Sequence, residues 1–254
     1  MENLWKVIML MLASVQFMGC SKSTAEKESR DCMVNIDTID FTFGIEYMHP
    51  EHYLVQGEQS EADLSHLDQI RGSIGDPVDS TGYLVDVCLW INQHFTFINA
   101  GGAMIGQVTV NELFETREFY GCHSQALIVS SVLRGLGFPA IMIETADVQW
   151  AYGYHAGSVD YFAGHVMSEI YVENRWILLD NNGIWLDGYD PLNPFIPQFN
   201  YPPDAYFVFA KGIDTWDYSQ KEASFTHENL IFFAENIYCF EDLFHTARYT
   251  WNTN

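Results

Sequence analysis

The stretch YGCHSQALIVSSVLRGLGFPA, residues 120–140, decides the fold of this chain. Its apolar residues leave almost no polar face, which predicts a central and buried helix. Two glycines and Pro139 end that helix, and Cys122 stands at its N-terminus, directly after Gly121. A cysteine in this position is open to four interpretations: a packing residue, half of a disulfide, a metal ligand or a nucleophile.

A helix N-terminus favours a thiolate over a thiol, because its unpaired N–H groups carry about half a positive charge. The same N–H groups can bind a developing oxyanion. A thiol nucleophile further requires a histidine and a third group that orients the imidazole. The question is therefore which histidine and which carboxylate the fold brings to Cys122.

The segment HVMSEIYVENRWILLD, residues 165–180, predicts a β-hairpin that supplies both groups. With a two-residue turn at 173–174, Asp180 lies on the same face as His165 and one diagonal step away from it. Diagonal neighbours are about 7–8 Å apart at the backbone, a distance that an imidazole and a carboxylate can bridge. A turn longer by one residue would move Asp180 to the opposite face.

The rest of the chain contains further helical patterns and an aromatic, proline-rich tail after residue 182. Apolar residues recur at helical spacing through 80–97, and Thr109 with Glu112 has the spacing of a capping box. No linker separates a second domain, so we expect the tail to pack on the core. The predicted segments are mixed structure at 36–82, a helix at 80–97, a loop at 101–107, a short helix at 109–121, a strand at 140–146, a loop at 147–163 and a helical stretch at 229–244.

These segments resemble the transglutaminase-like superfamily. In that family Gly-Cys or Gly-x-Cys opens a helix that ends in Arg-x-x-Gly-[IF]-Pro-Ala, and here the ending is RGLGFPA at 134–140. GHVMSEIYVENRWILLD is similar to the family's second segment, and VNELFETREFYGC resembles the sequence upstream of its cysteine. The resemblance covers about residues 83–182. It implies an α+β fold with a transglutaminase-like, papain-like core, in which a central helix packs on an antiparallel sheet.

By position, the resemblance implies that Cys122 is the nucleophile, His165 the general base and acid, and Asp180 the orienting carboxylate. Two features depart from the family pattern. Asp180 is followed by Asn181 and Asn182 where a Pro-Thr pair is usual, and no segment matches the calcium-binding segments of animal transglutaminases. Each residue also has a structural interpretation, as a helix-start cysteine, a strand histidine and a turn former at the end of a hairpin.

Three further residues are secondary candidates. Trp90 sits roughly where some family members place an oxyanion-hole tryptophan, although helical aromatics more often pack in the core. His123 is a second oxyanion candidate and competes with His165 as the base, but a residue adjacent to Cys122 is expected to point elsewhere on the helix. His155 lies in a segment rich in Tyr and Gly, and we expect it to face substrate or solvent.

The first twenty residues, MENLWKVIMLMLASVQFMGC, predict a signal peptide. Their apolar run from Val7 to Met18 is too short for a comfortable membrane span and has the length of a signal h-region. Gly19-Cys20 at its end resembles a bacterial lipobox, although Phe17 and Met18 stand where Leu and a small residue are usual. An ordinary cleaved signal or an uncleaved anchor is the alternative. We predict a lipoprotein signal peptide at 1–20 with Cys20 lipidated.

Composition limits the partners. A net charge of −23 repels phosphate backbones, which excludes nucleic-acid binding. No CxxC pair occurs, so a structural zinc site has no support in the sequence. We expect no metal, and the thiol chemistry implied by the resemblance needs no cofactor. Cys88 lies in an apolar helical run and is expected to be buried, whereas Cys32 and Cys239 are candidates for a disulfide.

The sequence therefore predicts a signal at 1–20, a tether at 21–35 and a single domain at 36–254, with its core at about 83–182 and an aromatic-rich C-terminal extension. The implied function is cysteine-dependent amide acyl transfer or hydrolysis, of the peptidase, amidase or transglutaminase type. The expected partners are a peptide or protein substrate and, through the lipid anchor, a bacterial membrane, with the domain extracytoplasmic on the periplasmic face or the cell surface. The alternative function is a non-catalytic surface lipoprotein that binds peptide or glycan in the same cleft.

Overall fold

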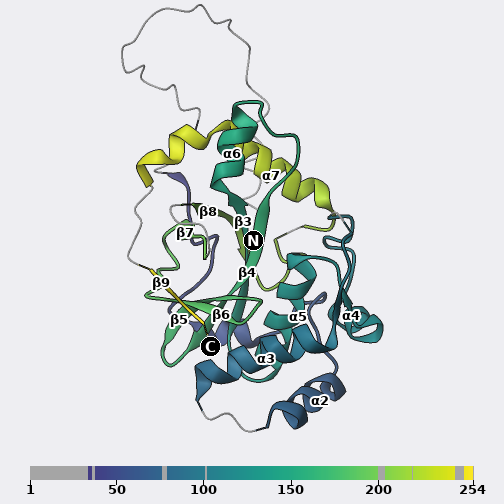
Figure 1. Ribbon diagram of the computed structural model, residues 1–254. Coiled ribbons are helices and arrows are strands. Elements are labelled where there is room, and N and C mark those ends of the chain that lie inside the picture. Colours follow the sequence, from purple (N-terminus) through teal and green to yellow (C-terminus); the bar gives the residue numbers. More distant parts are fainter. Residues whose placement is uncertain are drawn as a thin grey trace, which may run out of the picture. The chain divides into compact units, whose positions relative to one another are not determined.

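The computed structural model describes residues 34–35, 38–75, 79–100, 102–199, 204–218, 220–243 and 249–253 of the chain. At their centre is a seven-stranded sheet with the order β7-β8-β3-β4-β5-β6-β9, in which all neighbours are antiparallel (Figure 1). A separate two-stranded parallel sheet joins β1 to β2. The strands are β1 Thr96–Phe97, β2 Glu118–Phe119, β3 Ala140–Asp147, β4 Gly164–Val172, β5 Arg175–Asp180, β6 Ile184–Asp187, β7 Phe195–Pro197, β8 Ala205–Gly212 and β9 Thr250–Asn252.

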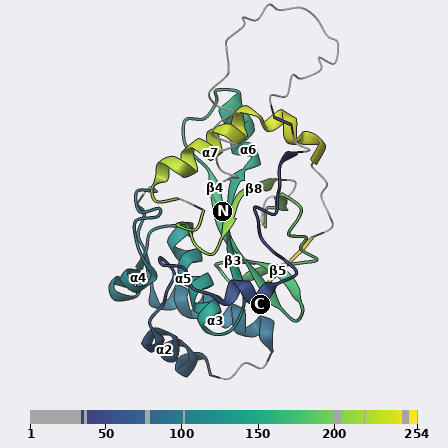
Figure 2. The same ribbon diagram turned by 180° about the vertical axis from the view of Figure 1, so that it is seen from behind.

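The helices form two groups along the long strands β3 and β4. Helices α2 to α5 lie together toward one end of these strands, and α6 and α7 lie side by side at the other end (Figures 1 and 2). Helices and an antiparallel sheet in one fold confirm the predicted α+β class. The helices are η2 Pro50–Leu54, α2 Leu64–Ile74, α3 Ser80–His94, α4 Val110–Thr116, α5 Cys122–Gly135, α6 Val148–His155, α7 Ala223–Glu235 and η3 Ile237–Leu243.

Helix α5 begins at Cys122, as predicted, because the residue before it is a glycine. Gly121 has a φ of 121°, a conformation that residues with a side chain rarely adopt. At the other end, Gly137 has a φ of 98°, and the N–H groups of Gly137 and Phe138 bond carbonyls of the last turn. The sequence therefore fixes both ends of the helix, and with them the position of the thiol.

The predicted packing of α5 on the sheet is also confirmed. Apolar residues of α3 and α5 and of the facing side of β3, β4 and β5 form one buried cluster. Ser130 and Ser168 share a hydrogen bond of 2.8 Å across this interface. Arg134 at the end of α5 donates to the carbonyls of Ala140 at 2.9 Å and Ile213 at 2.8 Å. The helix is thus fixed to β3 and to the segment after β8.

The hairpin of β4 and β5 has the predicted register. Val172 pairs with Arg175, and both turn residues, 173–174, have a positive φ, 52° and 61°. Two positive φ values are typical of the type I′ turn, which matches the twist of a two-residue hairpin. The register places Asp180 on the same face of the hairpin as His165, as expected.

The prediction of a loop at 147–163 is wrong for its first half, which forms α6. Asp147 caps this helix, because its carboxylate accepts a hydrogen bond from the Trp150 N–H at 2.7 Å. Trp150 and Ala151 are buried, and α6 packs against α7 and β3. Capping and tertiary packing therefore outweigh a composition rich in Gly and Tyr that is typical of loops.

The C-terminal extension completes the sheet at both edges. Strands β6 and β9 follow β5 on one side, and β8 and β7 follow β3 on the other. Helix α7 packs on the extension itself, where the rings of Phe207 and Phe233 stack at 4.2 Å between centroids. The tail therefore packs on the core, as expected. Among the described helices, none is long and apolar enough to cross a membrane.

The face of the sheet opposite α5 contains a buried ion pair. Lys211 Nζ of β8 lies 2.7 Å from Glu169 Oε1 of β4, and the two side chains are 1% and 0% exposed. The hydroxyls of Tyr47 and Tyr189 donate to the same carboxylate at 2.7 and 2.5 Å. Lys211 also donates to the carbonyl of Pro191 at 2.7 Å. The network joins the N-terminal segment, β4 and the C-terminal extension.

Candidate active site

Cys122 is a free, partly exposed cysteine at the first position of α5. The first N–H groups of a helix have no partner within it, and Gly121 offers no side chain to cap them. Ser124 Oγ accepts a hydrogen bond from the Tyr120 N–H, outside the helix, at 2.6 Å. The sulfur therefore lies at a helix end that presents N–H groups and the positive end of the helix dipole.

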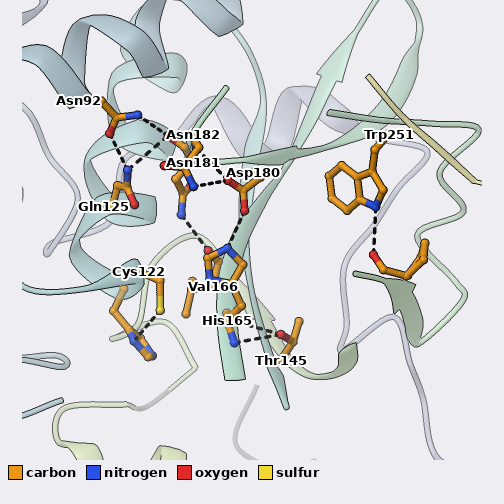
Figure 3. Close-up of polar contacts among 12 residues, drawn as sticks. Asn92, Cys122, Gln125, Thr145, His165, Val166, Asp180, Asn181, Asn182 and Trp251 are labelled. Carbon is orange, nitrogen blue, oxygen red and sulfur yellow. Dashed lines mark hydrogen bonds and ion pairs between the residues drawn. The ribbon is translucent and has the colours of Figure 1, made fainter. Parts of the chain in front are cut away.

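His165 and Asp180 are directly joined. Nε2 of His165 donates to Oδ2 of Asp180 at 2.6 Å, within the distance expected from the hairpin register (Figure 3). The pair forms where β4 begins and β5 ends. The pKa values of His165 and Cys122 depend on each other: His165 lowers that of Cys122, and Cys122 raises that of His165. Because Nε2 is bonded to Asp180, Nδ1 is the ring nitrogen that remains for the sulfur.

The other oxygen of the Asp180 carboxylate is held by Asn182. Oδ1 accepts hydrogen bonds from the backbone N–H and the side-chain amide of Asn182, both at 2.9 Å (Figure 3). Asp180 is 7% exposed, so these contacts replace solvent around a buried charge. The carboxylate is thus fixed on both oxygens and aims one of them at His165.

Asn181 anchors the same hairpin end to the helices. Its side-chain amide donates to the Val166 carbonyl at 2.8 Å, and its own carbonyl accepts from Asn92 of α3 at 3.2 Å and Gln125 of α5 at 3.4 Å (Figure 3). Gln125 and Asn92 are joined at 2.6 Å. Asn182 therefore positions the Asp180 carboxylate, and Asn181 positions the end of the hairpin against α3 and α5. The sequence analysis did not predict these roles.

His123 points toward the thiol, which corrects the expectation that it would point elsewhere on the helix. Its Nδ1 lies 3.9 Å from the Cys122 sulfur, and its Nε2 lies 2.6 Å from Glu144 Oε1 of β3. Glu144 is 1% exposed. The sequence analysis did not identify this residue, although one carboxylate in the apolar strand AIMIETA signals a buried partner.

The electrostatics of the site favour a thiolate. Burial raises the pKa of Cys122, but hydrogen bonds and charges from His123 and His165 outweigh it and lower this pKa to about 5. Burial lowers the pKa of His165, but hydrogen bonds to Asp180 and Cys122 raise it to about 10. Burial likewise lowers the pKa of His123, whereas the Glu144 charge and Cys122 raise it to about 10. Burial raises the pKa of Asp180, but His165 reverses this and holds it below its usual value.

Trp90 and His155 are the remaining sequence candidates. Trp90 is 6% exposed and stacks on His94 at 4.0 Å between ring centroids, as its structural interpretation predicts. Its Nε1 is buried and has no hydrogen-bond partner among the described residues. Its oxyanion role stays a prediction. His155 is exposed at the end of α6, and its Nδ1 lies 3.2 Å from the Ala234 carbonyl.

A cavity of about 320 Å³ opens beside His165 and Asp180. The ring of Tyr206 lies 5.8 Å from that of His165, and burial together with nearby carboxylates raises the pKa of Tyr206 to about 12. Tyr206 is therefore a neutral hydroxyl at physiological pH. The other lining residues are aromatic, apolar or amide side chains: Met167, Asn182, Ile184, Gln198, Phe199 and Trp251.

The other cysteines have different environments. Cys88 is 0% exposed, which confirms that it is buried, and burial raises the pKa of its thiol. Cys239 is disulfide-bonded. Its expected partner Cys32, like Cys20, lies outside the described residues, so the pairing stays a prediction.

A group of metal-ligating side chains occurs on the surface, at His49, Glu51 and His52. Each imidazole is paired with a carboxylate: His49 with Glu51 at 3.2 Å, and His52 with Glu46 at 2.8 Å. All these side chains are more than half exposed. The group belongs to the segment around η2 and is separate from the residues gathered at Cys122.

Comparison with known proteins gives a likeness to a solved structure. No family model matches the chain, and no curated protein matches it. The chain is similar to a solved structure described as a "putative cysteine protease" from Cytophaga hutchinsonii, at 16% identity and a TM-score of 0.47. The similarity covers 66% of this chain and 48% of that chain, so this chain spans about half of its length.

Proposed function

We propose that this chain catalyses acyl transfer from an amide through Cys122, most simply the hydrolysis of a peptide or protein amide. The observation that carries the proposal is the 2.6 Å contact of Asp180 with His165, an imidazole that lowers the pKa of a thiol at a helix N-terminus. A nucleophile, a base and a group that orients the base are the components of such chemistry.

In the proposed reaction the Cys122 thiolate attacks the amide carbonyl and a C–S bond forms. The C–N bond then breaks while His165 gives its proton to the departing amine. Water or another amine next attacks the thioester, His165 takes the proton of that nucleophile, and the thiolate returns. The N–H groups at the start of α5 offer hydrogen bonds to the oxyanion, for which His123 and Trp90 are further candidates.

We assign the amine side of the substrate to the cavity beside His165, because His165 delivers its proton to the departing nitrogen. The aromatic and amide lining suits apolar peptide side chains and peptide N–H and C=O groups. A net charge of −23 disfavours a strongly anionic substrate.

Intact-mass analysis tests the function. The chain is incubated with a peptide library, with and without a primary amine, and both protein and peptides are weighed. We expect a covalent acyl adduct on the protein and either cleaved, deamidated or amine-bearing peptides. Cys122→Ala should abolish adduct and product, whereas Cys88→Ala, a matched change at a buried thiol, should leave both in place.

Each outcome of this experiment is decisive. An adduct that survives Cys122→Ala contradicts the nucleophile. Peptides that bind without any adduct or product favour the alternative function, a binding protein that uses the same cleft. Product formed only when the amine is present identifies transfer rather than hydrolysis.

For the cellular site we propose a lipid anchor at Cys20, which would hold the domain at a bacterial membrane in an extracytoplasmic location, on the periplasmic face or at the cell surface. The support is the sequence alone, where Gly19-Cys20 closes the apolar run before a polar tether. Cys20→Ala should move the protein from the membrane fraction to the soluble fraction of cells. Unchanged sedimentation with membranes contradicts the lipobox, and Cys88→Ala controls for loss of a cysteine elsewhere.

A further inference from the structure

Two imidazoles act on Cys122, and each is held by a carboxylate from a different strand: His123 lies 3.9 Å from the sulfur, and His165 lowers the pKa of the thiol. His165 pairs with Asp180 at the end of β5, and His123 pairs with Glu144 in β3. Both nitrogen–oxygen distances are 2.6 Å. One imidazole is enough to activate a thiol, so the second requires an explanation.

The two imidazoles differ in their access to a substrate. His165 lines the cavity of about 320 Å³, whereas His123 lines a void of about 10 Å³, which has room for about one water. The carboxylate behind His123 is also more deeply buried, with Glu144 at 1% side-chain exposure and Asp180 at 9%. A general acid must reach the leaving group. The cavity gives His165 that reach, whereas the void at His123 is far smaller.

Glu144 is fixed by donors from two other parts of the fold. Its Oε1 accepts from His123 at 2.6 Å, from Thr226 of α7 at 2.8 Å and from Gln220 at 3.2 Å. Thr226 and Gln220 are buried residues of the C-terminal extension. A carboxylate beside an imidazole raises its pKa, as the Glu144 charge does for His123. The extension therefore acts on the thiol through Glu144 and His123.

Among the described residues, the ionisable groups around His123 are Glu144, His165 and Tyr218, together with the Cys122 thiol. Glu144 faces it from β3, His165 acts on the same sulfur from β4, and Tyr218 of the C-terminal extension lies near both Glu144 and Cys122. Burial raises the pKa of Tyr218 well above its ordinary value, so Tyr218 is neutral. The charges that raise the pKa of His123 are accordingly those of Glu144 and of the Cys122 sulfur.

We propose that the two imidazoles divide the work at Cys122: His123, fixed by Glu144, holds the sulfur as a thiolate, while His165, fixed by Asp180, moves the proton. When the C–S bond forms and the C–N bond breaks, the amine leaves with the proton of His165. His123 keeps its own proton throughout. In the return step His165 takes a proton from water, and the sulfur leaves as a thiolate beside a cation that is still in place. The inference deepens the proposed function and rests on it only for the proton-transfer step.

The pH dependence of Cys122 alkylation tests the division without any substrate. The protein is labelled with iodoacetamide at pH values from 4 to 10, and peptide mapping gives the labelled fraction of Cys122. Cys88 is free but buried, so labelling of Cys88 reports unfolding at a given pH. The wild-type midpoint should lie near 5. His123→Gln, whose amide can still donate to Glu144, should raise the midpoint by about 1–3 pH units. His165→Gln should leave it below neutrality, and the double variant should approach the ordinary value of about 8.5.

Two results would overturn the proposal. One is an ordinary midpoint in His165→Gln alone, which would make His165 the sole support of the thiolate. The other is an unchanged midpoint in His123→Gln. Glu144→Gln removes the charge next to His123 while keeping the size of the side chain. It should also raise the alkylation midpoint of Cys122, and it replaces His123→Gln if that variant does not fold.

Acylation by p-nitrophenyl acetate separates this proposal from the proposed function. Its leaving group needs no proton, so His165→Gln should still show an acylation burst while amide turnover falls about 10²–10⁴-fold. His123→Gln should slow the burst at pH 6, because a smaller fraction of the sulfur is thiolate at that pH. Suppose that the wild type shows no amide turnover while the alkylation midpoint still rises in His123→Gln and stays below neutrality in His165→Gln. That result contradicts the proposed function and leaves the division between the two imidazoles in place. If the burst is lost in His165→Gln and retained in His123→Gln, the proposed division of roles between the two imidazoles is wrong, and the proposed acyl transfer through Cys122 is unaffected.

Discussion

Replacing Asp180 by alanine should lower kcat for an amide substrate on the order of 10⁴-fold and leave KM nearly unchanged, because the orienting carboxylate acts on the base and not on substrate binding. The carboxylate holds Nε2 of His165 at 2.6 Å and leaves the other nitrogen for the thiol. His165→Ala should be at least as damaging, since it removes the base itself. Both values are measured with the peptide identified by intact-mass analysis.

The double variant makes this prediction specific. Residues that act as a unit show losses far below the product of the single losses, so Asp180→Ala combined with His165→Ala should be little worse than His165→Ala alone. Asp187→Ala is the matched control, because Asp187 is a half-exposed aspartate of β6, the strand next to β5. Its kcat should stay within a few-fold of wild type. Fully multiplicative losses would mean that Asp180 acts on stability or binding and not through His165.

The geometry of the hairpin was predictable because strand periodicity leaves little freedom once the turn is known. A two-residue turn with Glu173 and Asn174 fixes the register, and the register fixes which face Asp180 occupies. The helix start was predictable for a similar reason, since Gly121 permits a φ of 121° that other residues rarely adopt. These parts of the site follow from rules that act over a few residues.

The contacts that the sequence analysis missed act between segments far apart in the chain. His123 turns toward the thiol because Glu144 lies across from it on β3, and adjacency to Cys122 alone gave the opposite expectation. The positions of Asn181 and Asn182 were read as a departure from a family pattern, while their contacts depend on α3, α5 and Asp180. Such contacts follow only from the tertiary arrangement.

The helix and strands that the sequence analysis did not predict also depend on the tertiary arrangement. Helix α6 was hidden by a composition typical of loops, although Asp147 three residues before Trp150 is a capping signal. The strands after residue 182 were hidden by prolines and aromatic residues that do not alternate clearly. They form because β3 and β5 offer unpaired edges to which β8 and β6 add.

The buried ion pair on the far face of the sheet leads to the second large prediction. Lys211→Met should lower the free energy of unfolding by about 3–5 kcal/mol, because it leaves Glu169 buried and charged without its counter-charge. The hydroxyls of Tyr47 and Tyr189 still donate to that carboxylate, but neutral donors do not replace the ammonium group. Urea denaturation gives the midpoint and the slope, and the slope should stay unchanged if the native state is intact.

Two further variants decide whether Lys211→Met lowers the free energy of unfolding because the charge pair with Glu169 is lost. Arg175→Met breaks the exposed pair with Asp187, in which the side chains are 48% and 45% exposed, and should cost about 0–1 kcal/mol. The double variant Lys211→Met with Glu169→Gln removes both charges and leaves an amide to meet the tyrosine hydroxyls, so it should be more stable than Lys211→Met alone. A double variant less stable than the single one would show that Lys211 acts through its packing and its hydrogen bond to Pro191, and not through its charge. Recovery in the double variant would instead identify the unpaired carboxylate as the source of the loss, as expected for a charge that burial separates from water.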